Sequence, residues 1–414
     1  MFEFLVKYLL LLTLATGVVA CSKYSDETDD SDESDERNAA ISADAYKAQK
    51  KGPIFSELSR YSVEPQTPQK SDEIITSNST SNSASSSASN SASNNTFANV
   101  VPGYNITFPS DHSSHPEFAV EWWYITANLT DKQHNPYALQ WTLFRFATDT
   151  QSTPWANAQQ YMGHVGLRDG KEAWFEERFA RGGVGNAGIS SSPFNAFIDD
   201  WQWLAKSSVM FPSSLEFTIN TQIRVNLDFT ADKPFVKHGE QGFSRKLRDS
   251  EQASYYYSQP HIQVSGEIEL PTGKVEVSGN AWFDHEWTSQ YLSPLAQGWD
   301  WFSIHFDNGA KLMLFNMRHE QAHDFWSGTL ITKNGKVIHL SEQDIQAKVT
   351  KRDKVEQRLL PLHWSIQLPK HKIDIQIAPM QTKQWNPGIF SYYEGGTVIS
   401  GSHSGVGFIE LTGY

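Results

Sequence analysis

The chain has 414 residues, of which 39% are hydrophobic, 13% aromatic and 20% charged, and its net charge is −13 at pH 7. The mean hydropathy of −0.49 excludes a membrane protein with several spans, and the acidic balance argues against nucleic-acid binding. The single cysteine excludes an intrachain disulfide.

Residues 1–20 have the pattern of a signal peptide that ends in a lipobox. Lys7 precedes a short apolar run, and the segment closes with VVAC at Cys21. We therefore expect acylation of Cys21, which anchors the protein to a membrane because each buried CH₂ contributes ~0.8 kcal/mol. Since Ser22 follows instead of aspartate, the pattern favours the outer membrane of a bacterial cell envelope. The alternative is an ordinary secretory signal with an incidental cysteine.

Residues 21–96 are expected to form a disordered tether. Eight acidic residues lie between positions 26 and 36, where like charges repel and extend the chain. Residues 76–96 are almost wholly Ser, Asn, Thr and Ala, which cannot bury a core. A short apolar island at 54–63 either docks on the folded part or stays unstructured.

From Phe97 onward the pattern indicates β-structure. Apolar residues occupy nearly every odd position between 215 and 229 and polar residues the even ones, with a bend or turn expected near Asn220. Similar runs recur at 137–146, 264–270, 275–283, 301–306, 312–317, 330–340, 364–368, 373–377 and 406–411. Hairpin dipeptides stand at 169–170, 272–273, 308–309 and 334–335. The best helical candidate is 341–360. So many short strands predict two barrels or sandwiches.

Several blocks of the sequence resemble the AttH / carotenoid 1,2-hydratase family. They are FPSDHSSHPEFAVEWWYITANL (108–129), GHVGLRD (163–169), ERFARGG (177–183), YYYSQPHIQVSGEI (255–268), GNAWFDHEW (279–287), GWDWFSIHFDNG (298–309), YYEGGTVISG (392–401) and GVGFIELTGY (405–414). The resemblance implies an all-β fold of two tandem lipocalin-like antiparallel β-barrel domains, at 97–291 and 292–414. The family contains carotenoid hydratases and also bacterial lipoproteins labelled as hydrolases, some of them beside ABC transporters.

The family resemblance also indicates a catalytic acid. Hydration of an alkene begins with protonation of carbon, which needs a carboxylic acid kept neutral by an apolar pocket. Hydratases of this family carry such an aspartate in the block that holds Asp284 here, and His285 could relay a proton or orient water. Aromatic faces would stabilise the cation, and the expected ligand-binding residues are Trp122, Tyr124, Trp282, Trp287, Trp299 and Trp301. The alternative for Asp284 is a structural anion paired with an arginine.

A second group of polar residues lies in the first block. Asp111, His112 and His115 could ligate a metal together with His164 or His285, but loop histidines are more often structural, so no metal and no cofactor are predicted. This polar cluster, with Glu121 and His164, is expected to form hydrogen bonds around the interdomain cleft. If Glu121 is buried, it needs a partner such as Arg145 or Arg178.

Together these features predict an envelope lipoprotein that binds an apolar small molecule or lipid, with Asp284 as the general acid of a hydratase-type reaction. The alternative is a non-catalytic lipid carrier or accessory protein of an ABC-type envelope transporter. A hydrolase has little support, because the chain contains no G-x-S-x-G motif and no cysteine nucleophile.

Overall fold

The computed structural model describes residues 97–150, 157–248, 250–290, 296–320 and 323–414. Within these ranges the chain is all-β, without an α-helix, and its strands form two antiparallel sheets, as the sequence predicts. Short 3₁₀ turns occur at Ser110–His112, Glu342–Asp344 and Pro369–His371. The expected signal peptide, tether and apolar island at 54–63 lie outside the described residues.

The first sheet contains the strands of the N-terminal part. Its path runs β4-β3-β2-β1-β13-β12-β9-β8-β7-β6-β5, and β10 and β11 pair with β12. The bounds are β1 (Val120–Asp131), β2 (Pro136–Ala147), β3 (Gln159–Arg168), β4 (Ala173–Arg181), β5 (Ala187–Ser191), β6 (Phe194–Ile198), β7 (Trp201–Ala205), β8 (Ser213–Ile219), β9 (Ile223–Thr230), β10 (Val236–Lys237), β11 (Phe243–Arg245), β12 (Ala253–Leu270) and β13 (Gly273–Thr288).

The second sheet contains the remaining strands. Its path runs β17-β16-β15-β14-β23-β22-β20-β19-β18, and β21 pairs with β22. The bounds are β14 (Ala296–Phe306), β15 (Lys311–His319), β16 (Phe325–Ile331), β17 (Val337–Leu340), β18 (Gln346–Val355), β19 (Arg358–Leu368), β20 (Ile373–Pro379), β21 (Trp385–Asn386), β22 (Tyr392–Gly401) and β23 (Gly405–Leu411).

The turn chemistry of the sequence locates the hairpins. Three of the predicted dipeptides lie between β3 and β4, β14 and β15, and β16 and β17, and the fourth, 272–273, spans the end of the turn from β12 and the first residue of β13. The long alternating run breaks at the expected place: β8 ends at Ile219 and β9 begins at Ile223. Asn220 and Thr221 adopt positive φ angles of 49° and 58°, the left-handed conformation that such turns require.

The prediction of a helix at 341–360 is wrong. A capping box joins Ser341 and Asp344, but it supports a single 3₁₀ turn, after which the chain enters β18 and β19. Half-buried side chains alternate with exposed ones along β18, and β18 pairs with β19. The alternation of side chains that is typical of a β-strand therefore determines the conformation of this segment, and the local helix-start signal does not.

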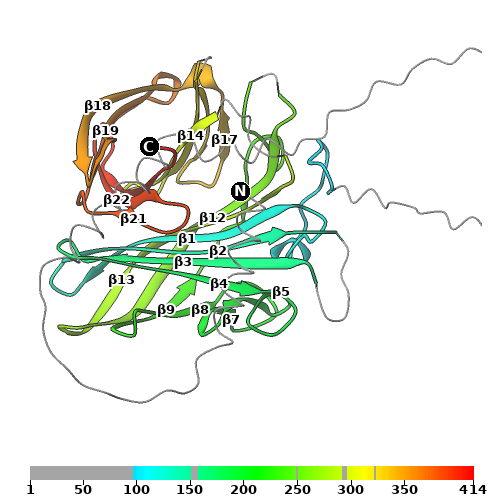
Figure 1. Ribbon diagram of the computed structural model, residues 1–414. Helices are drawn as coiled ribbons and strands as arrows, with labels where there is room; N and C mark the ends of the chain where they lie inside the picture. Colours follow the sequence, from blue (N-terminus) through cyan, green and yellow to red (C-terminus); the bar gives the residue numbers. More distant parts are fainter. Residues whose placement is uncertain (1–96, 151–156, 249, 291–295, 321–322) are drawn as a thin grey trace, which may run out of the picture.

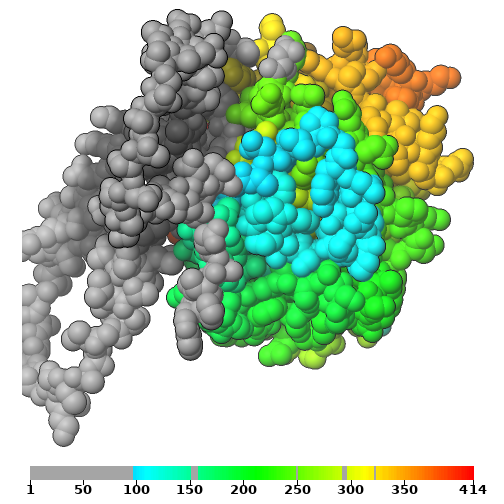
Figure 2. All heavy atoms as spheres, turned by 90° about the vertical axis from the view of Figure 1, so that its right-hand side faces the viewer, coloured from blue at the N-terminus to red at the C-terminus, as the bar shows by residue number. Residues whose placement is uncertain are grey.

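The two sheets lie against each other, and this contact decides which strands are buried on both faces. β9 has one buried face and one exposed face, whereas β1 is buried along almost its whole length. Figure 1 shows the curled second sheet with β21 and β22 close to β1 and β2, and β22 contacts β2 while β23 contacts β1. On the face shown in Figure 2, residues of the second sheet (yellow to orange) touch those of the first (green).

A separate apolar cluster fills the space between the sheets; we call it the inter-sheet seam. Its buried members are Tyr124, Ala138, Val236, Leu247, Tyr256, Trp282, Ala296, Trp301, Met313, Phe315, Met317, Ile331 and Phe408. Each sheet also encloses its own core. Among the described residues, we find no helix with the length and apolar character that a membrane span would need.

Candidate functional site

Strand alternation sends the two predicted catalytic residues to opposite sides of the first sheet. On β13, Phe283 and Trp287 belong to the core enclosed by that sheet, while Trp282 belongs to the seam. Because successive side chains of a strand point to opposite faces, Asp284 faces the seam and His285 faces the interior. His285 therefore does not act on the same site as Asp284.

His285 belongs to a hydrogen-bonded group inside the first sheet, which we call the interior network; its members are Asp111, His112, His115, Glu121, Arg145, Tyr257 and His285. Glu121 lies at its centre. Its Oε1 atom is 2.6 Å from His115 Nδ1 and 2.8 Å from His285 Nε2, and its Oε2 atom accepts from Arg145 Nε at 2.7 Å. The Tyr257 hydroxyl links His285 Nδ1 to His112 Nδ1, at 2.9 and 2.8 Å.

Charges in the interior network are compensated. Burial favours neutral Glu121, yet His115 and Arg145 hold its pKa well below the ordinary value. Burial likewise disfavours charged His115, but the carboxylates of Glu121 and Asp111 raise its pKa to about 9. Burial lowers the pKa of His285 to about 4, so this ring is neutral and donates from Nε2 to Glu121. Of the two arginines predicted as partners for a buried Glu121, Arg145 forms the ion pair with it. Arg178 pairs instead with Glu176 and Asp200.

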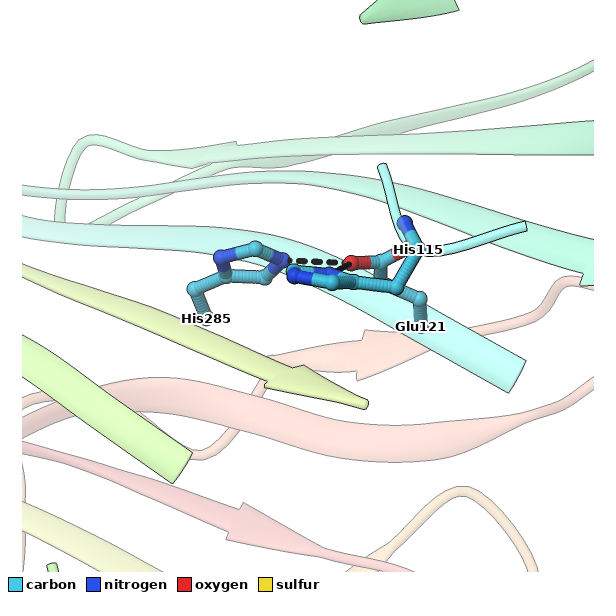
Figure 3. Close-up of side chains that lie close together, drawn as sticks. All are labelled: His115, Glu121 and His285. Carbon is cyan, nitrogen blue, oxygen red and sulfur yellow. Dashed lines mark hydrogen bonds and ion pairs between the residues drawn. The ribbon is translucent and has the colours of Figure 1, made fainter. Parts of the chain in front are cut away.

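Three members of the interior network lie close enough to be considered as metal ligands. The ligand atoms of His115, Glu121 and His285 lie within 4.8 Å of one another, and Figure 3 shows both imidazoles directed at the Glu121 carboxylate. The same atoms already bond one another, and Arg145 occupies the second carboxylate oxygen. A cation here would displace these bonds beside a fixed guanidinium, so the donor set suits a structural network better than a metal.

Asp284 lies in the seam with its carboxyl group surrounded by hydrogen-bond donors. Oδ2 lies 2.7 Å from the Tyr256 hydroxyl, and Oδ1 accepts from the Trp282 indole at 2.6 Å and from the Ser258 hydroxyl. The residue is 3% exposed, and no cation among the described residues forms an ion pair with it. Burial raises the pKa of Asp284 to about 7 although these three bonds favour the anion, and the charge of Glu286 adds to the rise.

A histidine other than the predicted one reaches Asp284 through Ser258. His238, directly after β10, places Nε2 2.6 Å from the Ser258 hydroxyl and Nδ1 2.9 Å from the Thr329 hydroxyl of the second sheet. Burial holds the pKa of His238 well below its ordinary value, so one ring nitrogen donates and the other accepts. Asp284, Ser258, His238 and Thr329 form a continuous chain across the seam.

Two further carboxyl groups of the second sheet share the seam. Glu410 retains some exposed surface as a residue, but its carboxyl is enclosed and accepts from Trp299 Nε1 at 2.7 Å. Burial raises the pKa of Glu410 to about 7, helped by the nearby charges of Asp284 and Glu286. Glu394 accepts a hydrogen bond from the Tyr124 hydroxyl, and burial raises its pKa well above the ordinary value.

The other predicted residues divide between the two regions. Trp122, Tyr124, Trp282, Trp299 and Trp301 lie in or against the seam, and Trp301 Nε1 donates to the Tyr256 hydroxyl at 3.2 Å. Trp287 lies in the interior core, stacked on His115 with 4.0 Å between ring centroids. His164 is separated from the interior network and bonds Glu177 and the Tyr392 hydroxyl.

Sequence reasoning missed Tyr256, Ser258, His238, Glu394 and Glu410. Signals for some of them exist: Glu410 is the one charge in the apolar run from Val406 to Leu411, which indicates a buried carboxyl. Ser258 is the register partner of Asp284 on the neighbouring strand, but that pairing is decided by the fold.

Two curled antiparallel sheets with a polar, aromatic-lined seam between them define a lipocalin-like two-domain protein. The sequence matches the family model described as AttH-like over residues 99–414, and the chain belongs to this family. The predicted family is thereby confirmed.

Two solved structures share the fold. A protein from Nitrosomonas europaea assigned as AttH is 30% identical, with a TM-score of 0.69 and coverage of 77% of this chain and 100% of that one. Kievitone hydratase from Nectria haematococca is 13% identical, with a TM-score of 0.56 and coverage of 77% and 96%, and shows likeness of fold alone. A comparison with curated proteins finds no match.

Proposed function

We propose that this protein is a hydratase-type enzyme for an apolar small molecule or lipid, with Asp284 as the general acid. The observation that carries the proposal is a buried carboxyl group with a pKa of about 7 and no cationic partner among the described residues. Such a group holds a proton near neutral pH and can release it, which is what a general acid requires.

The surroundings of Asp284 suit a cationic intermediate. Trp282 and Trp301 lie edge to face with 6.4 Å between ring centroids, and Tyr124 contacts Trp301 at 5.3 Å. The faces of such rings attract positive charge. An alkene carbon would take the proton of Asp284, the resulting carbocation would bind the oxygen of water, and the water proton would return to the Asp284 carboxylate. The sum is alkene plus water giving an alcohol.

His238 is a positioning residue in this scheme. Through Ser258 it fixes the orientation of the Asp284 carboxyl, and Thr329 fixes the His238 ring in turn. The chain connects the proposed acid to the second sheet, so that the proton-donating geometry depends on both sheets being in contact.

The proposal is tested in two steps. Native mass spectrometry of the delipidated protein after incubation with a membrane lipid extract identifies the ligand. Asp284→Asn then keeps the shape of neutral aspartic acid, because the amide oxygen accepts from Ser258 and Trp282 and the amide N–H replaces the acid O–H. We expect turnover to fall by ~10²-fold or more, with ligand uptake retained.

Ser341→Ala, at the exposed 3₁₀ turn of the second sheet, serves as the control and should retain turnover. Normal turnover by Asp284→Asn would remove Asp284 from the mechanism. Ligand uptake without turnover in either protein would favour the non-catalytic carrier or transporter accessory protein.

We propose further that the protein is an outer-membrane lipoprotein anchored through Cys21. Support comes from the VVAC sequence and from Ser22 at the following position. Cys21→Ser should release the protein from the membrane fraction or leave it as unprocessed precursor. Fractionation and migration like those of the wild type would contradict the anchor.

A further inference from the structure

The four strands at the edges of the two sheets differ in charge. β5 and β17 carry no Asp, Glu, Lys or Arg, and β4 carries two glutamates and two arginines. β18 instead carries Lys348, Lys351, Arg352 and Lys354 against the single anion Asp353, although the net charge of the whole chain is −13. Charges of either sign protect an edge strand from pairing with another chain. Protection alone therefore does not account for an excess of one sign on one edge.

The cations of β18 are accessible on the second sheet. The apolar side chains of this strand pack against the core that the second sheet encloses, whereas the four cations are exposed. Figure 1 shows β18 on the outer side of the curled second sheet. Lys351 pairs with Asp353 at 2.6 Å, but within the described part of the chain Lys348, Arg352 and Lys354 form no ion pair with a carboxylate. This edge thus offers three cations to an anionic partner.

A segment of the same chain has the complementary charge. Residues 26–36, with the sequence DETDDSDESDE, contain eight acidic residues and no basic one. Extended chain rises by ~3.3 Å per residue, so this segment has a length of about 36 Å, and the ten residues of β18 have a length of about 33 Å. The acidic segment can therefore lie beside the whole of β18.

The intervening chain is long enough to permit this contact. The segment from residue 37 to residue 96 can span up to ~200 Å at ~3.3–3.6 Å per residue, whereas a folded body of this size has a radius of gyration of about 20 Å. Because both partners belong to one chain, their association is intramolecular and does not require the affinity that a separate partner would need. A set of individually weak ion pairs is then sufficient.

We propose that the acidic segment 26–36 binds along the exposed edge of β18, where its carboxylates pair with Lys348, Arg352 and Lys354. The contact reduces the repulsion among the eight like charges of the segment, and it shields an edge strand whose outer backbone groups are available to another chain. The proposal concerns a surface outside the inter-sheet seam, and it does not depend on Asp284 being catalytic.

The test is cross-linking of the purified full chain with a carbodiimide, which joins a carboxylate directly to an amine that it contacts. We expect products that join residues 26–36 to Lys348, Lys351 or Lys354, identified by mass spectrometry of the peptides. Their yield should fall ~5-fold or more between about 0.1 M and about 1 M salt, because the Debye length shortens from ~10 Å to ~3 Å. Lys171 and Lys233, which are also exposed, are the control amines and should join the segment less.

A charge reversal on β18 tests the electrostatic origin of the contact. Arg352→Glu leaves the three lysines in place as targets, and the yield of their cross-links to residues 26–36 should fall ~3-fold or more because the new carboxylate repels the segment. Arg224→Glu, at an exposed position of β9, is the matched control and should keep the yield of the wild type. An unchanged yield in Arg352→Glu would overturn the proposal.

A second measurement leaves every described residue unaltered. In a variant whose eight acidic residues at 26–36 are replaced by Asn or Gln, the lysines of β18 should be acetylated by a soluble ester ~3-fold or more faster than in the wild type, because ion pairs no longer occupy their ammonium groups. The rates at Lys171 and Lys233 should not change. Equal rates at the β18 lysines in both proteins would contradict the contact.

Two other occupants of the β18 edge are distinguished in the same experiments. If a mixture of ¹⁵N-labelled and unlabelled chains gave mainly cross-links between the two isotopic forms, the partner would be a second copy and the intramolecular proposal would fail. Binding to phosphatidylglycerol vesicles that Arg352→Glu abolishes, without cross-links to residues 26–36, would assign the edge to a membrane surface and would likewise overturn it. Because no turnover is measured, either failure leaves the acid-catalysis proposal standing.

Discussion

The interior network and the inter-sheet seam bury the carboxyl groups of Glu121 and Asp284 on opposite faces of the first sheet, with opposite electrostatic results. Glu121 accepts from Arg145, His115 and His285, and its pKa is held well below the ordinary value. Asp284 accepts from neutral donors, and its pKa rises to about 7. For Asp284, three hydrogen bonds from neutral groups do not offset the effect of burial on the pKa, whereas the charged partners of Glu121 do. The first region suits a structural role and the second suits proton transfer.

The largest expected effect comes from removing the negative charge of Glu121 in the interior network. Glu121→Gln removes the anion and leaves the buried Arg145 without a carboxylate to compensate its charge, so the free energy of unfolding should fall by ~3–5 kcal/mol. Denaturant unfolding at pH 7 measures it. Glu216→Gln, on the exposed face of β8, is the matched control and should change stability by less than ~0.5 kcal/mol. Equal effects of the two substitutions would contradict a structural role for the interior network.

The second prediction concerns the pH dependence of stability. Asp284 has a pKa near 4 when unfolded and about 7 when folded, so between these values the folded state holds a proton that the unfolded state has lost. Its contribution to stability is complete below pH ~4 and decreases by ~1.4 kcal/mol per pH unit until pH ~7. Glu121 behaves oppositely, because its lowered pKa makes its contribution disappear in acid.

Asp284→Asn should remove the contribution of Asp284 to the change of unfolding free energy with pH. The contribution of Glu410 should remain. Unfolding free energies measured at pH 5 and at pH 7.5 give the slope for both proteins. An identical slope in wild type and Asp284→Asn would show that Asp284 is ionised throughout this range, as expected for a structural anion.

The smallest expected effect concerns Glu410, a second carboxyl group in the inter-sheet seam. Trp299→Phe keeps an aromatic side chain, although a smaller one, and removes the indole N–H that donates to Glu410, a bond that lowers the pKa of this carboxyl. Stability should fall by ~0.5–1.5 kcal/mol, and the pKa of Glu410 should rise from its value of about 7. Carboxyl ¹³C NMR titration measures the pKa. Trp326→Phe in the core of the second sheet is the control; a shift of similar size there would assign the change to altered packing.

The sequence determined the fold class, because alternation and turn chemistry are local. The run at 215–229 and the turn at Asn220 follow from periodicity and backbone preference alone, and the AttH-like blocks identify the family. The partner of Glu121 was also within reach, since a buried carboxylate needs a cation and Arg145 was one of two candidates. The failed helix at 341–360 shows the limit, because a capping signal fixes one turn and leaves the conformation of the next residues open.

Only the tertiary structure decided which face of each strand carries the chemistry. Asp284 and His285 are neighbours in the sequence, but the strand places them on opposite sides of a sheet whose two faces are both buried. The second face is buried because residues of the second sheet pack on it, some of them far away in the sequence, as the bond between Tyr124 and Glu394 illustrates. No local pattern encodes such a contact, since it arises from the packing of two sheets against each other.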